Sequence, residues 1–172
     1  MPSDTIYGLS CRALDARAVE RVYAIKHRDK DKPLVVLISS VDQLKELGIV
    51  TTEAAPALRY WPGKLTAVCM AEYAQEWLHR GTYTVAVRQP AYEQLLKLIA
   101  KIGPLISTSA NPQGQKPAAT ISQAKEYFSD NVDFYVDAGK LSGKPSTLVK
   151  PVFTKLKVLR QGAVRIRKAD QQ

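Results

Sequence analysis

Short apolar runs rich in β-branched residues alternate along this chain with segments whose apolar residues recur at helical spacing. In the clearest pair, the segment 15–26 carries Val19 and Val22 on one helical face, and the run LVVLI at 34–38 follows it. The periodic segment predicts an amphipathic helix, and the apolar run predicts a buried strand. Strands and helices mixed in this order are typical of an α/β domain.

The remaining elements follow from the same patterns and from capping residues. Asp15 is placed to begin the first helix, and the pairs Ser40–Gln43 and Thr120–Gln123 are capping-box patterns. The segment 109–120 is rich in prolines and amides and predicts a loop, and the polar tail after Arg167 predicts fraying. Further helices are expected over 41–47, 52–60, 90–102 and 120–128, and further strands over 64–70, 82–88, 104–108, 133–137, 146–150, 156–160 and 163–167.

Length and composition predict a single domain over residues 1–172. The chain is 45% hydrophobic, which is enough for one core, and it is too short for two ordinary domains. Its net charge is +9, from 25 Lys and Arg residues against 16 Asp and Glu residues. This excess favours an anionic partner, either the phosphates of a nucleotide, an RNA, or both; solubility alone is the other reading.

The cysteines and histidines give no sign of a metal site. Cys11 and Cys69 are far apart, no CxxC spacing is present, and only His27 and His79 could join them as ligands. Two isolated thiols are typical of a reducing cytoplasm. The sequence shows no signal peptide and no apolar run near the roughly 20 residues of a membrane span, so we expect a cytoplasmic protein with no membrane partner.

The stretch IKHRDKDKP, residues 25–33, concentrates positive charge just before the run LVVLI. Lys26 lies at the expected helix end and Arg28 just beyond it, so their cationic groups can converge on one phosphate. Asp29 and Asp31 could instead pair with these cations and make the stretch a solvated turn.

Two further segments place hydroxyl groups next to strand ends. STSAN at 107–111 follows the strand PLI, and GKPSTLV at 143–149 combines Gly143 with Ser146. Such hydroxyls can bind phosphate oxygens or a ribose, and a glycine allows close backbone approach. A capped turn and a hairpin are the alternatives, and the spacing of a P-loop is absent.

Two other residues draw attention by their positions. Arg88 ends an expected strand, where its guanidinium can form a fork with a ligand carboxylate or a structural ion pair. Trp61 follows a helix in WPGKLT, and we expect it to pack at the core or its rim rather than stack on a base. No Ser-His-Asp arrangement is evident, so nucleophilic catalysis is not expected.

Taken together, these segments resemble the YrdC/Sua5 family, the threonylcarbamoyl-AMP synthases of tRNA modification. The combination of the Lys-x-Arg turn with STSAN is the specific part of the resemblance. The matching stretches keep the family order and cover nearly the whole chain: SDTIYGLSCRA (3–13), YAIKHRDKDKPLVVLI (23–38), WPGKLTAV (61–68), VAVRQP (85–90), PLISTSANPQGQKPA (104–118), GKPSTLV (143–149) and VLRQGAV (158–164).

The resemblance implies a fold and an activity. The fold is an open, twisted, mixed α/β sheet flanked by helices, with a basic concave face. The activity joins L-threonine, bicarbonate and ATP, accompanied by Mg²⁺, into threonylcarbamoyl-AMP and pyrophosphate. The product serves N6-threonylcarbamoyladenosine formation at position 37 of ANN-decoding tRNAs, through a separate transferase complex, and tRNA itself could contact the basic face.

The resemblance also implies roles for individual residues. The basic and polar group around the nucleotide and the carboxylated intermediate would be Lys26, Arg28, Ser109 and Asn111. The ATP contacts would be Arg28, Lys32, Thr84, Ser109, Pro117 and Arg160. The threonine contacts would be Thr5, Tyr7, Leu37, Arg88, Ser107 and Ser146, with Arg88 binding the carboxylate.

The sequence departs from the family pattern in three respects. It starts inside the N-terminal motif, so we expect the family's first strand and helix to be missing and a sheet edge to be unpaired. Asp29 replaces the usual proline after Arg28, and the extra C-terminal domain of the longer branch is not expected. The alternative functions are a non-catalytic RNA-binding module of the same fold and a carbamoyl-transfer domain of the kind found in hydrogenase-maturation proteins, whose partner domains this sequence lacks.

Overall fold

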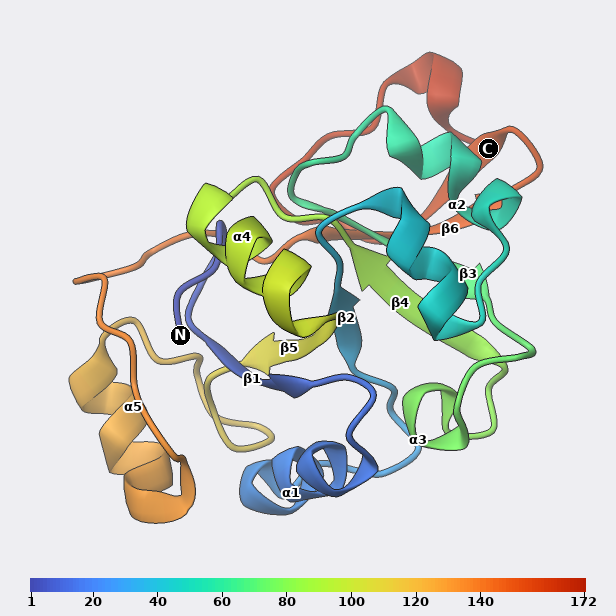
Figure 1. Ribbon diagram of the computed structural model, residues 1–172. Coiled ribbons are helices and arrows are strands. Elements are labelled where there is room, and N and C mark those ends of the chain that lie inside the picture. The colour runs from blue at the N-terminus through green and yellow to red at the C-terminus, as the bar shows by residue number, and fades with distance from the viewer.

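The computed structural model describes residues 1–172 and contains a seven-stranded sheet flanked by helices (Figure 1). The strands are β1 (Gly8–Arg12), β2 (Val35–Leu37), β3 (Leu65–Met70), β4 (Thr84–Arg88), β5 (Leu105–Ser109), β6 (Thr147–Val152) and β7 (Lys155–Arg160). The helices are α1 (Ala16–Lys26), α2 (Thr51–Leu58), α3 (Glu76–His79), α4 (Glu93–Ile102) and α5 (Ile121–Phe128), and the 3₁₀ turns are η1 (Val41–Leu47), η2 (Ser129–Asn131) and η3 (Lys168–Asp170).

The sheet is open and mixed, as predicted. Its strand order is β1-β5-β2-β4-β3-β6-β7. The pairs β2–β4 and β3–β6 are parallel, and the other four neighbouring pairs are antiparallel. None of the helices is long and apolar enough to cross a membrane.

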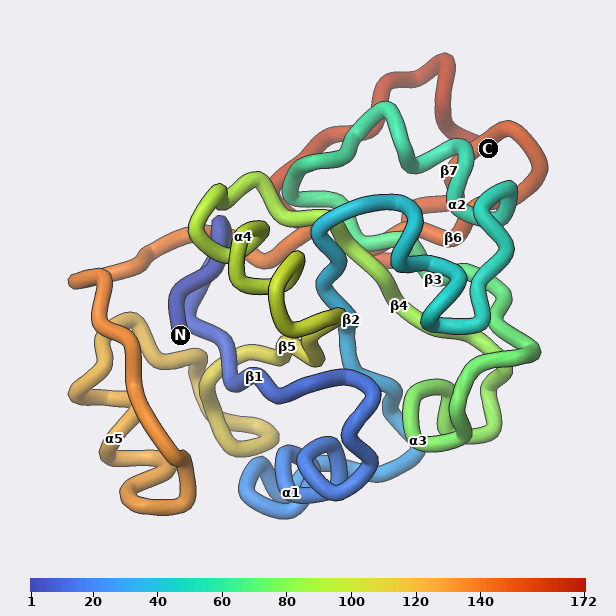
Figure 2. The backbone as a smooth tube through the Cα atoms, in the orientation of Figure 1, coloured from blue at the N-terminus to red at the C-terminus, as the bar shows by residue number.

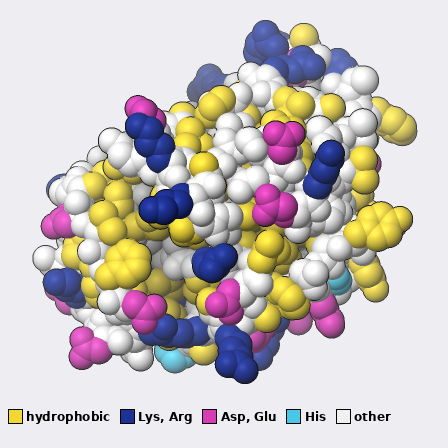
Figure 3. Space-filling model, viewed as in Figure 1, with side chains coloured by type: hydrophobic (Ala, Val, Ile, Leu, Met, Phe, Trp, Pro, Cys, Tyr) yellow, Lys and Arg dark blue, Asp and Glu magenta, His cyan; other side chains and the backbone are white.

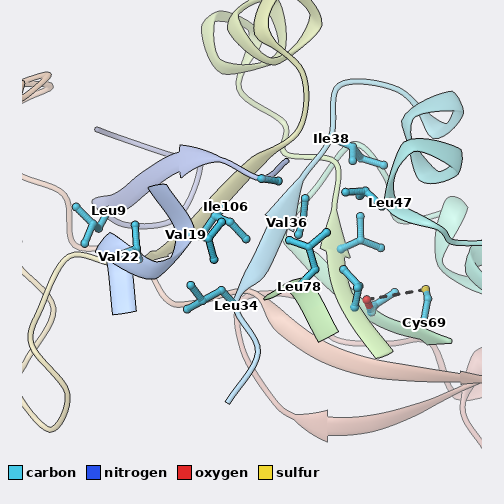
Figure 4. Close-up of a cluster of buried hydrophobic side chains, with 14 of the residues drawn as sticks. Leu9, Val19, Val22, Leu34, Val36, Ile38, Leu47, Cys69, Leu78 and Ile106 are labelled. Carbon is cyan, nitrogen blue, oxygen red and sulfur yellow. Dashed lines mark hydrogen bonds between the residues drawn. The ribbon is translucent and has the colours of Figure 1, made fainter. Parts of the chain in front are cut away.

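Helices cover the two faces of the sheet unequally. Side chains alternate along each strand, so Val36 and Ile106 point to the face covered by α1, where Val19 and Val22 meet them in the main core (Figure 4). Leu37 and its neighbours on the opposite face pack under α4 in a separate small cluster with Leu95, Ile99 and Leu105. The part of that opposite face beyond α4 is left for polar residues.

Two of the three predicted helix caps are confirmed. The Asp15 carboxylate accepts a hydrogen bond from the Ala18 N–H (3.0 Å), and the Thr120 hydroxyl accepts one from the Gln123 N–H (3.3 Å). The Ser40 prediction is wrong, because Ser40 makes no side-chain cap and η1 is a 3₁₀ turn. Gln43 instead accepts from the N–H and hydroxyl of Ser39.

Three strand assignments differ from the structure. The strand β1 was not expected, because GLSCR is polar and begins with glycine. The expected strands at 133–137 and 163–167 do not form. At 163–167, hydrogen bonds to the Thr147 side chain replace those that a neighbouring strand would make. The Thr147 hydroxyl accepts from the N–H groups of Gly162 and Val164 and donates to the Val164 carbonyl. Smaller shifts affect helix bounds, since α2 covers 51–58 and α4 begins at Glu93.

Each edge of the sheet is partly covered by an end of the chain. Beside β1, the N–H and C=O of Gly8 both pair with Met1 (2.9 and 2.8 Å), so the edge expected to be unpaired is covered at this point. Beside β7, Leu156 pairs with Gln171 in a parallel bridge. Covering unpaired backbone groups in this way limits edge-to-edge association.

The expectation of a frayed tail after Arg167 is wrong. The Asp170 carboxylate, only 6% exposed, accepts hydrogen bonds from Arg59 (2.6 Å), the Tyr60 hydroxyl (2.6 Å) and Arg167 (2.9 Å). The Lys155 ammonium also donates to the Ala169 carbonyl. A single acidic residue in a basic segment therefore anchors the end of the chain.

Candidate active site

A polar cavity of about 330 Å³ opens on the sheet face beyond α4. It is bounded by the N-terminal segment 3–8, the ends of β4 and β5, and the beginning of β6. Three arginines line it, Arg28, Arg88 and Arg160, and no aspartate or glutamate does. Six Ser and Thr residues also line the cavity: Ser3, Thr5, Ser107, Thr108, Ser109 and Ser146.

This lining suits an anionic ligand. Arginines offer planar donors for phosphate or carboxylate, and hydroxyls add neutral donors at short range. On the face of the molecule in Figure 3, by contrast, Lys and Arg side chains are dispersed among Asp and Glu side chains over most of the surface. A second cavity of about 70 Å³, between β1 and α5, is mainly apolar and shares only Tyr7 and Gly8 with the first.

The predicted charged turn, residues 26–33 and hereafter the basic turn, is folded around Arg28. The Arg28 guanidinium donates to the carbonyls of Lys32 (3.1 Å) and Pro33 (3.3 Å), and it lines the cavity. Lys32 lies outside the cavity, where its ammonium pairs with Asp29 (3.1 Å). In this structure Lys32 thus forms the solvated ion pair that was the alternative, and its contact with ATP stays a prediction.

Lys26 joins the basic turn to the segment 107–115, hereafter the hydroxyl loop. It is 2% exposed, and its ammonium donates to the carbonyls of Ser109 and Asn111 instead of facing the cavity. Burial and the nearby Arg28 lower the pKa of Lys26 to about 8. Two more hydrogen bonds complete the junction: the Gln113 N–H donates to the Lys26 carbonyl (2.8 Å), and the Asp29 N–H donates to the Gln113 side-chain oxygen (3.0 Å).

The hydroxyl loop divides its residues between the cavity and its own support. Ser107 and Ser109 line the cavity from β5. Asn111 does not: it is 8% exposed, and its amide donates to the carbonyls of Pro112 (2.9 Å) and Gln115 (2.8 Å). The Asn111 Oδ1 is buried without a partner. Lys26 and Asn111 thus stabilise the loop that presents Ser109.

Arg88 forms the structural ion pair that was the alternative to a ligand contact, and its partner, Asp4, is a residue that sequence reasoning missed. Its Nη1 lies 2.8 Å from the Asp4 carboxylate, and both side chains are 5% exposed. The other Asp4 oxygen accepts from the Ala91 N–H (3.1 Å), and the Arg88 Nε is buried without a partner. Burial lowers the pKa of Arg88, and Asp4 opposes that shift. Arg88 also lines the cavity, so the ion pair and a carboxylate-binding role are compatible.

The remaining predicted threonine contacts surround Arg88 in part. Thr5, Ser107 and Ser146 line the cavity, and the Ser146 hydroxyl lies 2.7 Å from that of Thr66. Tyr7 also lines the cavity, but its hydroxyl donates to the Gly139 carbonyl (2.7 Å) and accepts from the Ala138 N–H (2.8 Å). This contact holds the segment that returns from α5 in Figure 2.

Gly143 and Trp61 behave as predicted. A side chain at position 143 would collide with the Thr5 carbonyl, so close backbone approach is the reason for glycine there. Trp61 is partly buried against the main core, and its indole N–H donates to the Leu65 carbonyl (2.7 Å).

Two predicted contacts lie away from the cavity and two line it. Leu37 is 1% exposed under α4, and the Thr84 hydroxyl contacts that of Thr82 (3.0 Å) near the start of β4. Pro117 and Arg160 line the cavity, and Arg160 donates to the Ser146 carbonyl (3.0 Å). Leu37 and Thr84 do not line the cavity in this structure, and their contacts to threonine and ATP stay predictions.

Neither the cavity nor the rest of the chain contains a cluster of three or more His, Cys, Asp or Glu side chains that could hold a metal ion. Both cysteines are free thiols, and burial raises the pKa of each to about 12. A divalent cation carried by a triphosphate would therefore find its ligands among phosphate oxygens and water, with hydroxyls of the lining as the nearest protein groups.

Comparisons with known proteins identify the family of this chain. The Sua5/YciO/YrdC family model, described as telomere recombination, matches residues 1–162. The threonylcarbamoyl-AMP synthase of Pyrococcus abyssi is 37% identical over 153 residues, which are 86% of this chain and 45% of that protein. That of Marinobacter nauticus is 34% identical over 155 residues, which are 86% of this chain and 81% of that protein.

Solved structures give the same result. The crystal structure of P. abyssi Sua5 complexed with L-threonine matches with a TM-score of 0.84 and 36% identity, over 94% of this chain and 49% of that one. This chain thus spans about half the length of the P. abyssi relative and most of the M. nauticus relative. The family match over most of the chain shows that this protein belongs to the Sua5/YciO/YrdC family.

Proposed function

We propose that this protein is an L-threonylcarbamoyladenylate synthase, a nucleotidyltransferase that makes threonylcarbamoyl-AMP and pyrophosphate from L-threonine, bicarbonate and ATP. The main support is the cavity, which is lined by Arg28, Arg88, Arg160 and six Ser and Thr residues and by no carboxylate. The names of the relatives and the threonine bound in one solved structure support the same activity.

The proposed chemistry needs no enzyme nucleophile. The amine of threonine adds to bicarbonate and loses water to give a carbamate. A carbamate oxygen then attacks the α-phosphorus of ATP, and pyrophosphate leaves as the bond to the β-phosphate oxygen breaks. The enzyme must hold two anions against each other and stabilise the charge that develops on the α-phosphate.

The lining residues divide naturally between the two anions. Arg28, Ser109 and Arg160 would bind the phosphates, while Arg88, with Thr5, Ser107 and Ser146, would bind the threonine carboxylate and hydroxyl. Lys26 and Asn111 would act through the hydroxyl loop that they support. Mg²⁺ would arrive bound to ATP and offset part of the triphosphate charge, since no carboxylate lines the cavity.

The partners implied by this activity are also proposals. The product would pass to a separate transferase complex for t6A formation in ANN-decoding tRNAs. Direct tRNA contact would use the basic residues around the cavity, and the net charge of +9 favours such a contact. An RNA-binding module without catalysis is the competing function.

Threonine-dependent pyrophosphate release, measured with ATP, Mg²⁺ and bicarbonate present, tests the proposal. Wild-type protein should release pyrophosphate only when threonine is added. Arg28→Ala should abolish turnover and keep the fold, because Arg28 lies on a turn outside the regular elements. Lys30→Ala is the matched control from the same turn: its side chain is 72% exposed and outside the cavity, so turnover should persist. No release by wild type, with RNA binding intact, would favour the binding module.

A further inference from the structure

Beyond Lys26, the last residue of α1, the basic turn has no regular secondary structure, so its shape depends on the side chains that hold it. The Lys32 carbonyl is the common acceptor: the Arg28 Nε donates to it from one side (3.1 Å), and the Tyr23 hydroxyl donates to it from α1 (3.0 Å). A carbonyl oxygen has two lone pairs, so both bonds can form together. Arg28 is thereby connected to a rigid helix through one shared oxygen.

Tyr23 is well placed to hold that oxygen still. Its side chain is 2% exposed, and it does not line the polar cavity. Burial raises the pKa of Tyr23 above its usual value, so the hydroxyl stays protonated and remains a donor. The Tyr23 carbonyl also accepts from the Arg28 N–H (3.0 Å), which fixes the start of the turn against the same residue.

A second arginine fixes the Tyr23 ring in turn. The Arg80 guanidinium carbon lies 4.2 Å from the centroid of that ring, a cation–π contact, and Arg80 also pairs with Glu20 of α1. Arg80 follows α3 in a left-handed conformation (φ 51°), and its side chain is 13% exposed. Arg80, which directly follows α3, therefore restricts the position of the Tyr23 ring on α1.

We propose that Tyr23, held by Arg80, is a positioning residue that keeps the Arg28 guanidinium directed at the triphosphate. This inference rests on the proposed function, because it assigns Arg28 to ATP. Tyr23 itself touches no substrate. Its hydroxyl sets the position of the Lys32 carbonyl, and that carbonyl sets the direction of Arg28.

The test compares Tyr23→Phe with wild type by calorimetric titration with ATP–Mg²⁺ and by steady-state kinetics. Loss of one hydroxyl bond should weaken ATP binding about three- to tenfold, the range expected for a single hydrogen bond. The KM for threonine should change less than twofold, because Thr5 and Arg88 are untouched. Arg80→Lys, which keeps the charge and loses the planar stack, should weaken ATP binding in the same direction and by less.

Tyr135→Phe is the matched control. It removes a bond of the same type, from the Tyr135 hydroxyl to the Ser129 carbonyl (2.7 Å). Neither residue belongs to the basic turn or lines the polar cavity, so ATP affinity should be unchanged. A lower melting temperature of Tyr23→Phe with unchanged ATP affinity, or an equal weakening for threonine and ATP, would overturn the inference. Failure of wild type to bind ATP would overturn the proposed function as well, so the two failures are distinguishable.

Discussion

The ion pair between Asp4 and Arg88 makes a strong prediction about stability. Both side chains are 5% exposed, and no other acidic residue faces Arg88 from the cavity. Asp4→Asn keeps the size of the side chain and removes its charge, which leaves the arginine buried without a counter-ion. Removing one partner of a buried pair costs about 3–5 kcal/mol, out of a total stability of about 5–15 kcal/mol.

For a chain of this length the loss corresponds to a fall in Tm of about 6–20 °C, at about 2–4 °C per kcal/mol. Urea denaturation followed by circular dichroism measures the free energy directly. Glu93→Gln is the control, since it breaks the Glu93–Lys97 pair, whose side chains are both 75% exposed, and should cost less than about 1 kcal/mol.

The double variant Asp4→Leu/Arg88→Met separates the cost of leaving one buried charge unpaired from the net contribution of the ion pair to stability. Replacing both partners by apolar residues removes the unpaired charge, so the double variant should be more stable than Asp4→Asn. If the unfolding free energy of Asp4→Asn lies within about 1 kcal/mol of the wild-type value, the argument that this ion pair is desolvated and coupled is refuted.

Two further predictions follow from shifted pKa values. The pKa of Asp170 is lowered, first by the hydrogen bond from Tyr60 and then by Arg167, so its contribution to stability is present above about pH 4, the unfolded value, and is lost as the pH falls through the folded value. The difference in unfolding free energy between wild type and Asp170→Asn should therefore shrink between pH 5 and about pH 2.5; a constant difference would contradict this. The pKa of about 12 for Cys11 and Cys69 predicts slow reaction of both with a disulfide reagent at neutral pH, and rapid reaction of two thiols after denaturation. One fast thiol in the native protein would be inconsistent with its burial.

Local patterns in the sequence were sufficient for most of the sheet and the helices. Apolar runs such as 34–38 must be buried, and capping residues such as Asp15 act on atoms only three residues away. The strand β1 was not predicted, because it forms through its pairing with β5 and its own composition gives no strand pattern. The expected strand at 163–167 failed for a similar reason, since one hydroxyl of Thr147 supplies the hydrogen bonds that a neighbouring strand would have supplied.

Sequence reasoning predicted which residues belong to the site better than it predicted how they are arranged. Arg28 and Ser109 line one cavity although 81 residues separate them, and only the family resemblance indicated that they would meet. Local reasoning could not show that Lys26 supports the loop, because the carbonyls it binds, those of Ser109 and Asn111, lie 83 and 85 residues away along the chain. Asn111 bonds only within its own loop, to the carbonyls of Pro112 and Gln115. The same holds for Asp4, whose partner lies 84 residues away.

The most direct test of the account is a crystal structure with a non-hydrolysable ATP analogue, Mg²⁺ and L-threonine bound. The account predicts triphosphate oxygens within hydrogen-bond distance of both Arg28 and Ser109, and the threonine carboxylate at Arg88, with Lys26 still bonded to the hydroxyl loop. A nucleotide bound outside this cavity, or one that contacts only one of the two segments, would contradict it.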